Sequence, residues 1–242
     1  MKLINAMRNL TNRFLKAKRN IIFNYKSNKR FKQITLWEVL TDGNKTLKKF
    51  LKKNEANEDL YLFAKDLTLE EFLNTCERGD WILWLFTKMN PESKEITLVK
   101  GRCANIIRNI IEKQGGSSVI DTAIDFGEGR ASKDELNKAW QKANNIYDTA
   151  GIAADAARSA LDAAICTGSD TTFLEKAVDI QEAFTEAAGA TLAAVELGYC
   201  AEYAVSYVVD TVSRMAGKDR MEEEKRNTRK QTADICRKYL PL

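Results

Sequence analysis

The sequence predicts an all-α fold, a multi-helix bundle that contains a long alanine-rich helical hairpin. The block Ala131–Ala216 holds 21 alanines in 86 residues, and it has no proline. The whole chain has two prolines, Pro91 and Pro241, and its apolar residues recur every three or four positions. Alanine is the best helix former and an interior proline costs about 3 kcal/mol, so these segments are predicted to be helices.

Two helices are predicted between residues 60 and 90. Thr68 and Glu71 have the spacing of a capping box, and the helix that they open is predicted to stop at Gly79. Asp80 then has the place of an N-cap for the apolar helix Trp81–Phe86. The tryptophans of this run could form an aromatic platform for a ligand, but a run that is apolar all round favours core packing.

The middle of the chain predicts two further helices, separated by glycines. The first is Ile96–Lys113, which is closed by the pair Gly115 and Gly116. The second is the short helix Val119–Phe126, which ends at Gly127. Neither glycine-rich segment is predicted to bind phosphate, because no Lys-Ser or Lys-Thr pair follows and no strand precedes.

The alanine-rich block predicts a pair of tightly packed helices. Ser132 and Glu135 form a second capping box, and they open a helix predicted to reach Cys166. Gly168–Asp170 is the predicted hairpin, and Thr172–Ala216 is the predicted return helix. Alanines on facing helices allow an interaxial distance of about 8 Å. The buried stripe of the first helix is predicted to comprise Leu136, Ala139, Trp140, Ala143, Ile146, Tyr147, Ala150, Ala153, Ala154, Ala157, Ala160, Leu161 and Ala164.

Glycines are predicted to interrupt or end the helices in the remainder of the chain. Gly189 and Gly198 are weak points of the return helix, or sites where another helix approaches closely. Gly217 is predicted to end that helix, and the last helix is predicted over Lys218–Leu240.

Charge divides the chain into two predicted parts, a basic N-terminal arm of residues 1–53 and an all-helical domain of residues 60–242. Residues 1–53 carry 15 Lys and Arg against 2 Asp and Glu, a net charge of +13. Residues 54–242 carry 23 against 32, a net charge of −9. The arm is predicted to begin with a basic amphipathic helix that ends near Ile22 and to continue as a polar linker; Ile34–Leu40 fits a strand or a short helix equally.

The basic arm contains the candidate binding residues of the sequence. Its cations and interleaved aromatic rings suit phosphates and stacked bases, so nucleic acid is one predicted partner. A basic amphipathic helix suits an anionic membrane surface or a protein partner as well, and a tail that lies against the acidic body is the simplest alternative. The candidate residues are Arg13, Lys16, Lys18, Arg19, Lys26, Lys29, Arg30 and Lys32.

Composition argues against several kinds of chemistry. The chain has no histidine, which is the commonest general base and transition-metal ligand. Its five cysteines include no C-x-x-C pair, so we expect reduced, mostly buried thiols and no zinc site. No transmembrane helix or signal peptide is predicted. We therefore expect a cytoplasmic, non-enzymatic protein with no cofactor and no metal.

One charged cluster in the alanine-rich block is a candidate site. Arg158 can pair with Asp155 three residues before it and with Asp162 four residues after it, and Asp148 lies on the same polar side. Paired carboxylates can do acid–base work or bind a cation, but a solvated, charged helix face is the ordinary interpretation.

Four segments together resemble a known family. They are Trp81–Leu85, Leu98–Ala104, Ala123–Ala131 before the capped alanine-rich hairpin, and Ala233–Pro241. In this order they are similar to the alanine-rich helical proteins of bacteria and their phages that are described as immunity proteins. The resemblance covers roughly residues 60–242. It implies an all-helical fold and a role in binding and neutralising a toxin or effector, and it supplies no catalytic residues.

The resemblance and the acidic body favour an intracellular binding protein, immunity-like or anti-defence-like, that sequesters a protein partner. The alternative is a nucleic-acid-binding or membrane-surface accessory protein that acts through the basic arm. An enzyme that uses carboxylates and Mg²⁺ is ranked below both. The sequence leaves the identity of the partner and the oligomeric state open.

Overall fold

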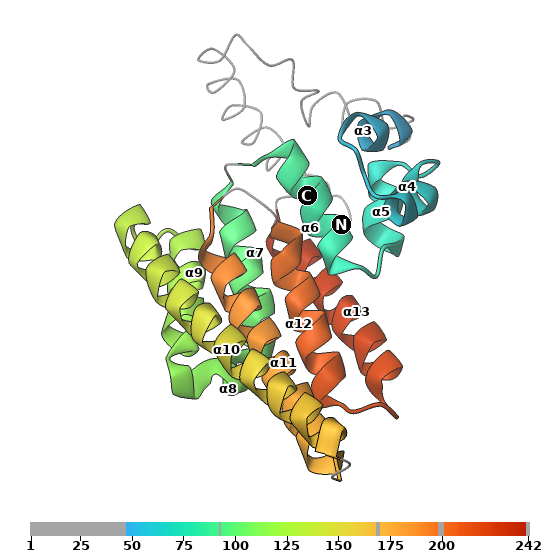
Figure 1. Cartoon of the computed structure of the whole chain (residues 1–242). Helices are drawn as coiled ribbons and strands as arrows, with labels where there is room; N and C mark the ends of the chain where they lie inside the picture. The colour runs from blue at the N-terminus through green and yellow to red at the C-terminus, as the bar shows by residue number, and fades with distance from the viewer. Residues whose placement is uncertain (1–46, 92, 168–169, 198–200, 241–242) are drawn as a thin grey trace, which may run out of the picture. The chain divides into compact units, whose positions relative to one another are not determined.

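The computed structural model describes residues 47–91, 93–167, 170–197 and 201–240. Across these ranges the chain forms helices joined by short connections and no strand, which confirms the predicted all-α class (Figure 1). The chain divides into two units, Met1–Gly43 and Asn44–Leu242. All of the described residues belong to the second unit.

Three short helices open the described chain: α3 (Lys48–Lys53), α4 (Glu58–Ala64) and α5 (Leu69–Thr75). The capping box that opens α5 is confirmed, because Glu71 N donates to Thr68 Oγ1 at 3.2 Å and Thr68 N donates to Glu71 Oε2 at 2.8 Å. Helix α5 ends at Thr75 rather than at the predicted Gly79, since the next residue already has an extended backbone.

Helix α6 (Gly79–Met89) begins earlier than predicted, and Asp80 is not its N-cap. The Asp80 carboxylate accepts from Arg78 Nε at 3.1 Å, which occupies it with a side chain outside the helix. Glycine is required at position 79 because a Cβ there would lie 2.6 Å from the backbone of Thr232. The apolar run is mostly buried as predicted, but Trp81 and Trp84 are half-buried, and Trp81 packs against Phe63 at 5.5 Å between ring centroids.

Helix α7 (Lys94–Ala104) is the central helix of the described unit. It packs against α9, α11, α12 and α13, and most of its residues are buried whichever side they face (Figure 1). The prediction of a single helix over Ile96–Lys113 is wrong. Beyond Ala104 it divides into η1 (Asn105–Ile107), α8 (Arg108–Ile111) and η2 (Glu112–Gln114).

A side-chain hydrogen bond spans the first part of this irregular segment, because Asn105 Oδ1 accepts from Arg108 Nε at 2.7 Å. The segment then ends where predicted, at Gly115, whose φ of 79° lies in the left-handed region that favours glycine. Helix α9 (Gly116–Gly127) follows directly, and a Cβ on Gly127 would lie 2.6 Å from the backbone of Leu98 in α7.

Helices α10 (Lys133–Thr167) and α11 (Thr172–Val195) form the predicted alanine-rich hairpin. The capping box of α10 is confirmed by Glu135 N, which donates to Ser132 Oγ at 3.2 Å, and by Ser132 N, which donates to Glu135 Oε2 at 2.7 Å. The predicted stripe of α10 is buried only in part. Trp140 is 41 % exposed, and of the alanines after Ala154 none is buried. The residues of α10 that are buried are Leu136, Ala139, Ala143, Ile146, Ala150 and Ala154.

The prediction of a single return helix is also wrong, because α11 ends at Val195 and the separate helix α12 (Ala201–Met215) packs against it. Glu196 has an extended backbone, with ψ of 129°, and its carbonyl oxygen accepts a hydrogen bond from Lys100 Nζ of α7. The predicted break at Gly198 lies outside the described residues. After Gly217, whose φ is 75° as a helix end requires, α13 (Met221–Tyr239) packs against α12 and α6.

The core is formed by alanine as much as by larger side chains. One cluster joins α7, α9, α10 and α11 and includes Leu98, Ile120, Leu136 and Ala150. A smaller one lies between α11 and α12 and contains Ala187. Most of the described cysteines are buried free thiols, in agreement with the prediction: Cys76, Cys103 and Cys236 are buried, and Cys166 is exposed.

We predict a pH signature for Lys100, which is 1 % exposed and whose pKa burial lowers to about 8. Between pH 8 and pH 10.5 the unfolded chain retains the proton that the folded chain has lost, so the stability contributed by this group rises with pH. Over that window the free energy of unfolding of the native protein should rise relative to that of Lys100→Met, by on the order of 3 kcal/mol. Denaturant titrations of both proteins at several pH values measure this difference, and a difference that stays constant would contradict the assignment.

Candidate functional site

The candidate site is the free end of the α10–α11 hairpin, which we call the hairpin tip and define as residues 155–182. Ala154 is the last buried residue of α10, and Ala183 is the first buried residue of α11. Between them, none of the described side chains is buried. In Figure 1 the two helices run side by side to the end of this segment. None of the described residues of this segment belongs to either of the two core clusters.

One stripe of α11 continues from the core onto the hairpin tip. Its members are spaced alternately by four and three residues, which places them on one helical face. The stripe is buried in the second half of α11, where α7, α9 and α12 cover it. Toward the tip the same face becomes exposed, with Ile180 at 56 % and Phe173 at 78 %. The stripe consists of Phe173, Ala177, Ile180, Phe184, Ala187, Thr191 and Ala194.

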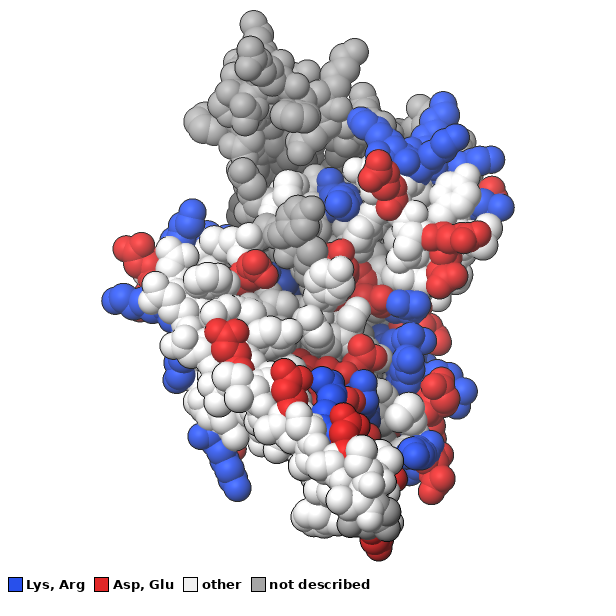
Figure 2. All heavy atoms as spheres, viewed as in Figure 1, with Lys and Arg blue, Asp and Glu red and all other residues white. Residues whose placement is uncertain are grey.

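Further apolar side chains add to the exposed surface of the hairpin. Ile152 and Ile165 of α10 are 72 % and 59 % exposed. The remaining aliphatic residues of the α10 part of the tip are Leu161 and five alanines, namely Ala156, Ala157, Ala160, Ala163 and Ala164. Figure 2 shows that the end of the hairpin carries few charged side chains on the face in view. Apolar side chains thus make up a large part of this surface, and on α10 most of them are alanines.

An ion-pair network joins the base of the tip to α12. Glu182 accepts from Arg158 of α10 at 2.8 Å and from Arg214 of α12 at 2.7 Å, so it links three helices. Arg214 Nε also donates to Glu186 Oε1 at 2.7 Å. Arg158 pairs with Asp155 at 3.1 Å as predicted. Its second partner is Glu182, however, and not the predicted Asp162, because the neighbouring helix offers a carboxylate across the hairpin seam.

The inner end of this network is partly buried. Burial raises the pKa of Glu186, although the hydrogen bond from Arg214 opposes that change. Glu186 Oε2 is buried and has no hydrogen-bond partner among the described residues. Burial likewise raises the pKa of Tyr207, whose ring lies against Gly189, where an added Cβ would lie 3.1 Å away. Gly189 is therefore a close-approach site of α11, one of the two roles predicted for it.

The hairpin tip is acidic. It contains six Asp and Glu against two Lys and Arg, a net charge of −4. Arg158 is already held by Asp155 and Glu182, which leaves Lys176 as the basic residue without an ion pair in the described part of the tip. The exposed carboxylates of Asp162 and Asp179 form no ion pair with any described residue.

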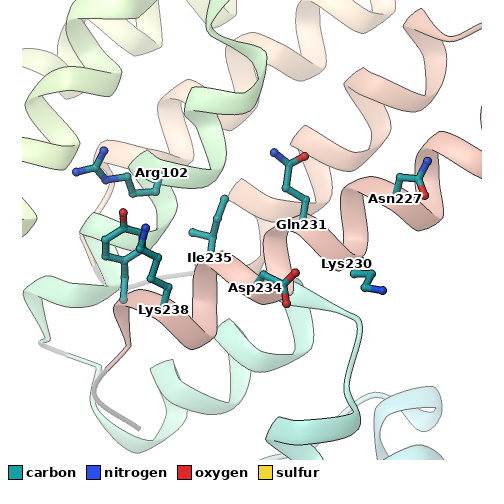
Figure 3. Close-up of a pocket in the computed structure, with 8 residues that line it drawn as sticks. Arg102, Asn227, Lys230, Gln231, Asp234, Ile235 and Lys238 are labelled. Carbon is teal, nitrogen blue, oxygen red and sulfur yellow. The ribbon is translucent and has the colours of Figure 1, made fainter.

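A second surface feature is a shallow hollow of about 530 Å³ between α7 and α13 (Figure 3). Its lining includes Arg102, Lys230 and Lys238. Arg102 is paired with Glu128 at 2.5 Å. Arg102 and Lys238 lie at one end of the hollow and Lys230 lies at the other (Figure 3). The cationic groups therefore do not converge on a common ligand position.

The binding residues predicted from sequence lie elsewhere in the chain. All eight of them, Arg13, Lys16, Lys18, Arg19, Lys26, Lys29, Arg30 and Lys32, lie outside the described residues. The hairpin tip was not singled out from sequence. Its signal was the alternating spacing of the large side chains of α11 within an alanine-rich segment. That spacing predicts an apolar helical face that packs against other helices, but it does not tell which part of the face other helices cover.

We predict that Glu182→Gln loosens the hairpin, because it weakens the pairs with Arg158 and Arg214 together. Amide hydrogen exchange of residues 155–167 should rise several-fold, and the Tm should fall by roughly 2 °C. Asp179→Asn is the matched control, since it removes the same charge from the same helix without breaking an ion pair. Equal effects of the two substitutions would contradict the role given to Glu182.

Among the described residues, no group of three or more His, Cys, Asp or Glu is placed to hold a metal ion. None of the described helices combines the length and the hydropathy of a membrane span. The comparisons with known proteins add no relative. No family model, no curated protein and no solved structure matches the chain.

Proposed function

We propose that the protein is a non-enzymatic binding protein that sequesters a protein partner at the hairpin tip. The observation that carries this proposal is the α11 stripe, which is covered by neighbouring helices at one end and exposed at the other. The role is immunity-like or anti-defence-like in the sense implied by the sequence resemblance, in which a helical protein holds and neutralises a toxin or effector.

The energetics of the exposed stripe support a protein as the partner. Full burial of a side chain such as Phe173 or Ile180 is worth about 1.5–3 kcal/mol each. Single exposed apolar residues are ordinary on a protein surface, but neighbouring ones on one face mark interaction sites. Phe173 and Ile180 are seven residues apart and so share a helical face. A partner that covers this face gains both contributions.

The position of the tip supports the proposal as well. A two-helix projection can be covered by a partner without disturbing the core around α7, because none of the described tip residues contributes a buried side chain. The network of Glu182 with Arg158 and Arg214 fixes the base of the projection. The binding surface is therefore held in place before the partner arrives, which lowers the ordering cost of association.

The test is affinity capture of the full-length protein from its native host, with quantification of bound proteins. We expect a stoichiometric protein partner, and we expect Phe173→Asp and Ile180→Asp each to lose it, because a buried carboxylate in the contact is unfavourable. Purified partner and purified variants then give affinities by calorimetry. Both substitutions replace exposed side chains, so the Tm should change by less than about 2 °C.

Leu62→Asp is the matched control for this test, since Leu62 is an exposed apolar residue of α4 outside the hairpin. It should retain the partner at unchanged stoichiometry. A partner that binds both tip variants as tightly as the native protein would overturn the assignment of the site. Failure to recover any stoichiometric partner, with no toxin or defence gene beside the gene for this protein, would overturn the function.

A second candidate function rests on the net charge of +13 in residues 1–53. It is the binding of nucleic acid or of an anionic membrane surface by the basic arm. Replacing the eight candidate residues by glutamine in the full chain should abolish binding to DNA, RNA or anionic vesicles. That binding should weaken roughly tenfold or more as salt is raised to physiological strength. Absence of salt-sensitive binding by the native protein would end this alternative.

A further inference from the structure

The exposed stripe of α11 also indicates what kind of element covers it. We propose that the partner inserts an amphipathic α-helix along Phe173, Ala177 and Ile180, and that this helix carries Lys or Arg beside its apolar face. This inference rests on the proposed function, and it adds the chemistry of the partner.

The spacing of the stripe selects a helix as the occupant. Residues that alternate by four and three along α11 have the average spacing of 3.5 residues with which side chains pack as knobs into the holes of a facing helix. The buried half of the same stripe already packs in this way, with Ala187 and Ala194 fully buried against neighbouring helices. An added helix at the tip would meet the same repeat, with the bulky Phe173 and Ile180 on either side of the small Ala177.

The small side chains of α10 favour close approach. Five of the seven aliphatic residues of α10 within the tip are alanine, and the other two are Leu161 and Ile165. A surface of methyl groups lets a helix approach toward the short end of the usual 8–10 Å interaxial range. Loops and strands gain less from such a surface, because their own side chains do not form a matching ridge. The tip thus offers bulky anchors on α11 and room beside them on α10.

Charge selects a basic helix. The net charge of −4 on the tip includes the exposed carboxylates of Asp162 and Asp179, neither of which has an ion pair in the described structure. Lysine or arginine beside the apolar face of the incoming helix would have these two carboxylates available for ion pairs. A second copy of the same tip would bring the same net charge of −4, and the repulsion disfavours pairing of two tips.

The test uses three synthetic peptides of roughly 18 residues, about five helical turns. The basic peptide has Leu and Ala at alternating spacings of four and three, with Lys at the flanking positions. The acidic peptide has the same apolar stripe with Glu in place of Lys. The scrambled peptide has the composition of the basic one, with its apolar residues distributed around the helix. Fluorescence anisotropy measures the binding of each to the full-length protein at low and at physiological salt.

We expect the basic peptide to bind roughly tenfold more tightly than the other two, and to weaken as salt rises. Phe173→Asp and Ile180→Asp should each reduce its affinity roughly tenfold, and Leu62→Asp should leave it unchanged. A double variant, Asp162→Lys with Asp179→Lys, should weaken the basic peptide and strengthen the acidic one. This charge exchange alters neither the apolar stripe nor the core, so its effect reports on charge selection alone.

Three results would overturn the inference. Equal binding of the three peptides would contradict both the helical form and the basic charge proposed for the partner segment. Binding of the basic peptide that Phe173→Asp leaves unchanged would contradict the assignment of the site. A dimer of the native chain in light scattering that Phe173→Asp dissociates would make a second copy the occupant. A captured partner that is lost with Phe173→Asp, in a protein that binds none of the peptides, would leave the proposed function standing and reject only the helical occupant.

Discussion

The structure depends on a mismatch of helix lengths. Helix α10 has 35 residues and, at a rise of about 1.5 Å per residue, spans about 52 Å. Helices α9 and α12, which pack against the hairpin, have 12 and 15 residues and span only about 18 and 22 Å. The hairpin is therefore longer than these two helices, and none of the described side chains at its end is buried. The exposed part of the α11 stripe is the direct consequence of this difference.

The hairpin is held at its base by contacts of α11 with α7 and α12. Helix α7 is surrounded by α9, α11, α12 and α13, and it approaches α9 closely because Gly127 has no side chain. The buried Lys100 of α7 donates to the carbonyl oxygen of Glu196, directly after the end of α11. The chain reverses after this point, so α12 can lie against α11 and supply Arg214 to the network of Glu182 and Glu186. The ion pairs of Arg214 thus join α12 to the base of the hairpin.

The parts of the fold that could be predicted from sequence are those set by local physics. The capping boxes at Thr68 and Ser132 and the helix end at Gly217 depend on neighbouring residues alone, and each is found where the sequence places it. The wrong end of the return helix depends on a distant residue, because the end of α11 involves Lys100, nearly a hundred positions away. The wrong N-cap has a local cause, because the Asp80 carboxylate is held by Arg78, only two residues before it. Burial of the alanine stripe was overpredicted because periodicity marks an apolar face without telling how far other helices extend along it.

Hydroxyl-radical footprinting, read by mass spectrometry, tests the central claim most directly, because it measures the accessibility of individual side chains. In the free protein, Phe173 should be oxidised readily, whereas Phe72 and Phe86, which are at most 1 % exposed, should remain protected. With the partner bound, Phe173 should become protected too, while Leu62, which is outside the hairpin, should react as before. If Phe173 is already protected in the free protein, or remains equally reactive in the complex, the hairpin tip is not the binding surface.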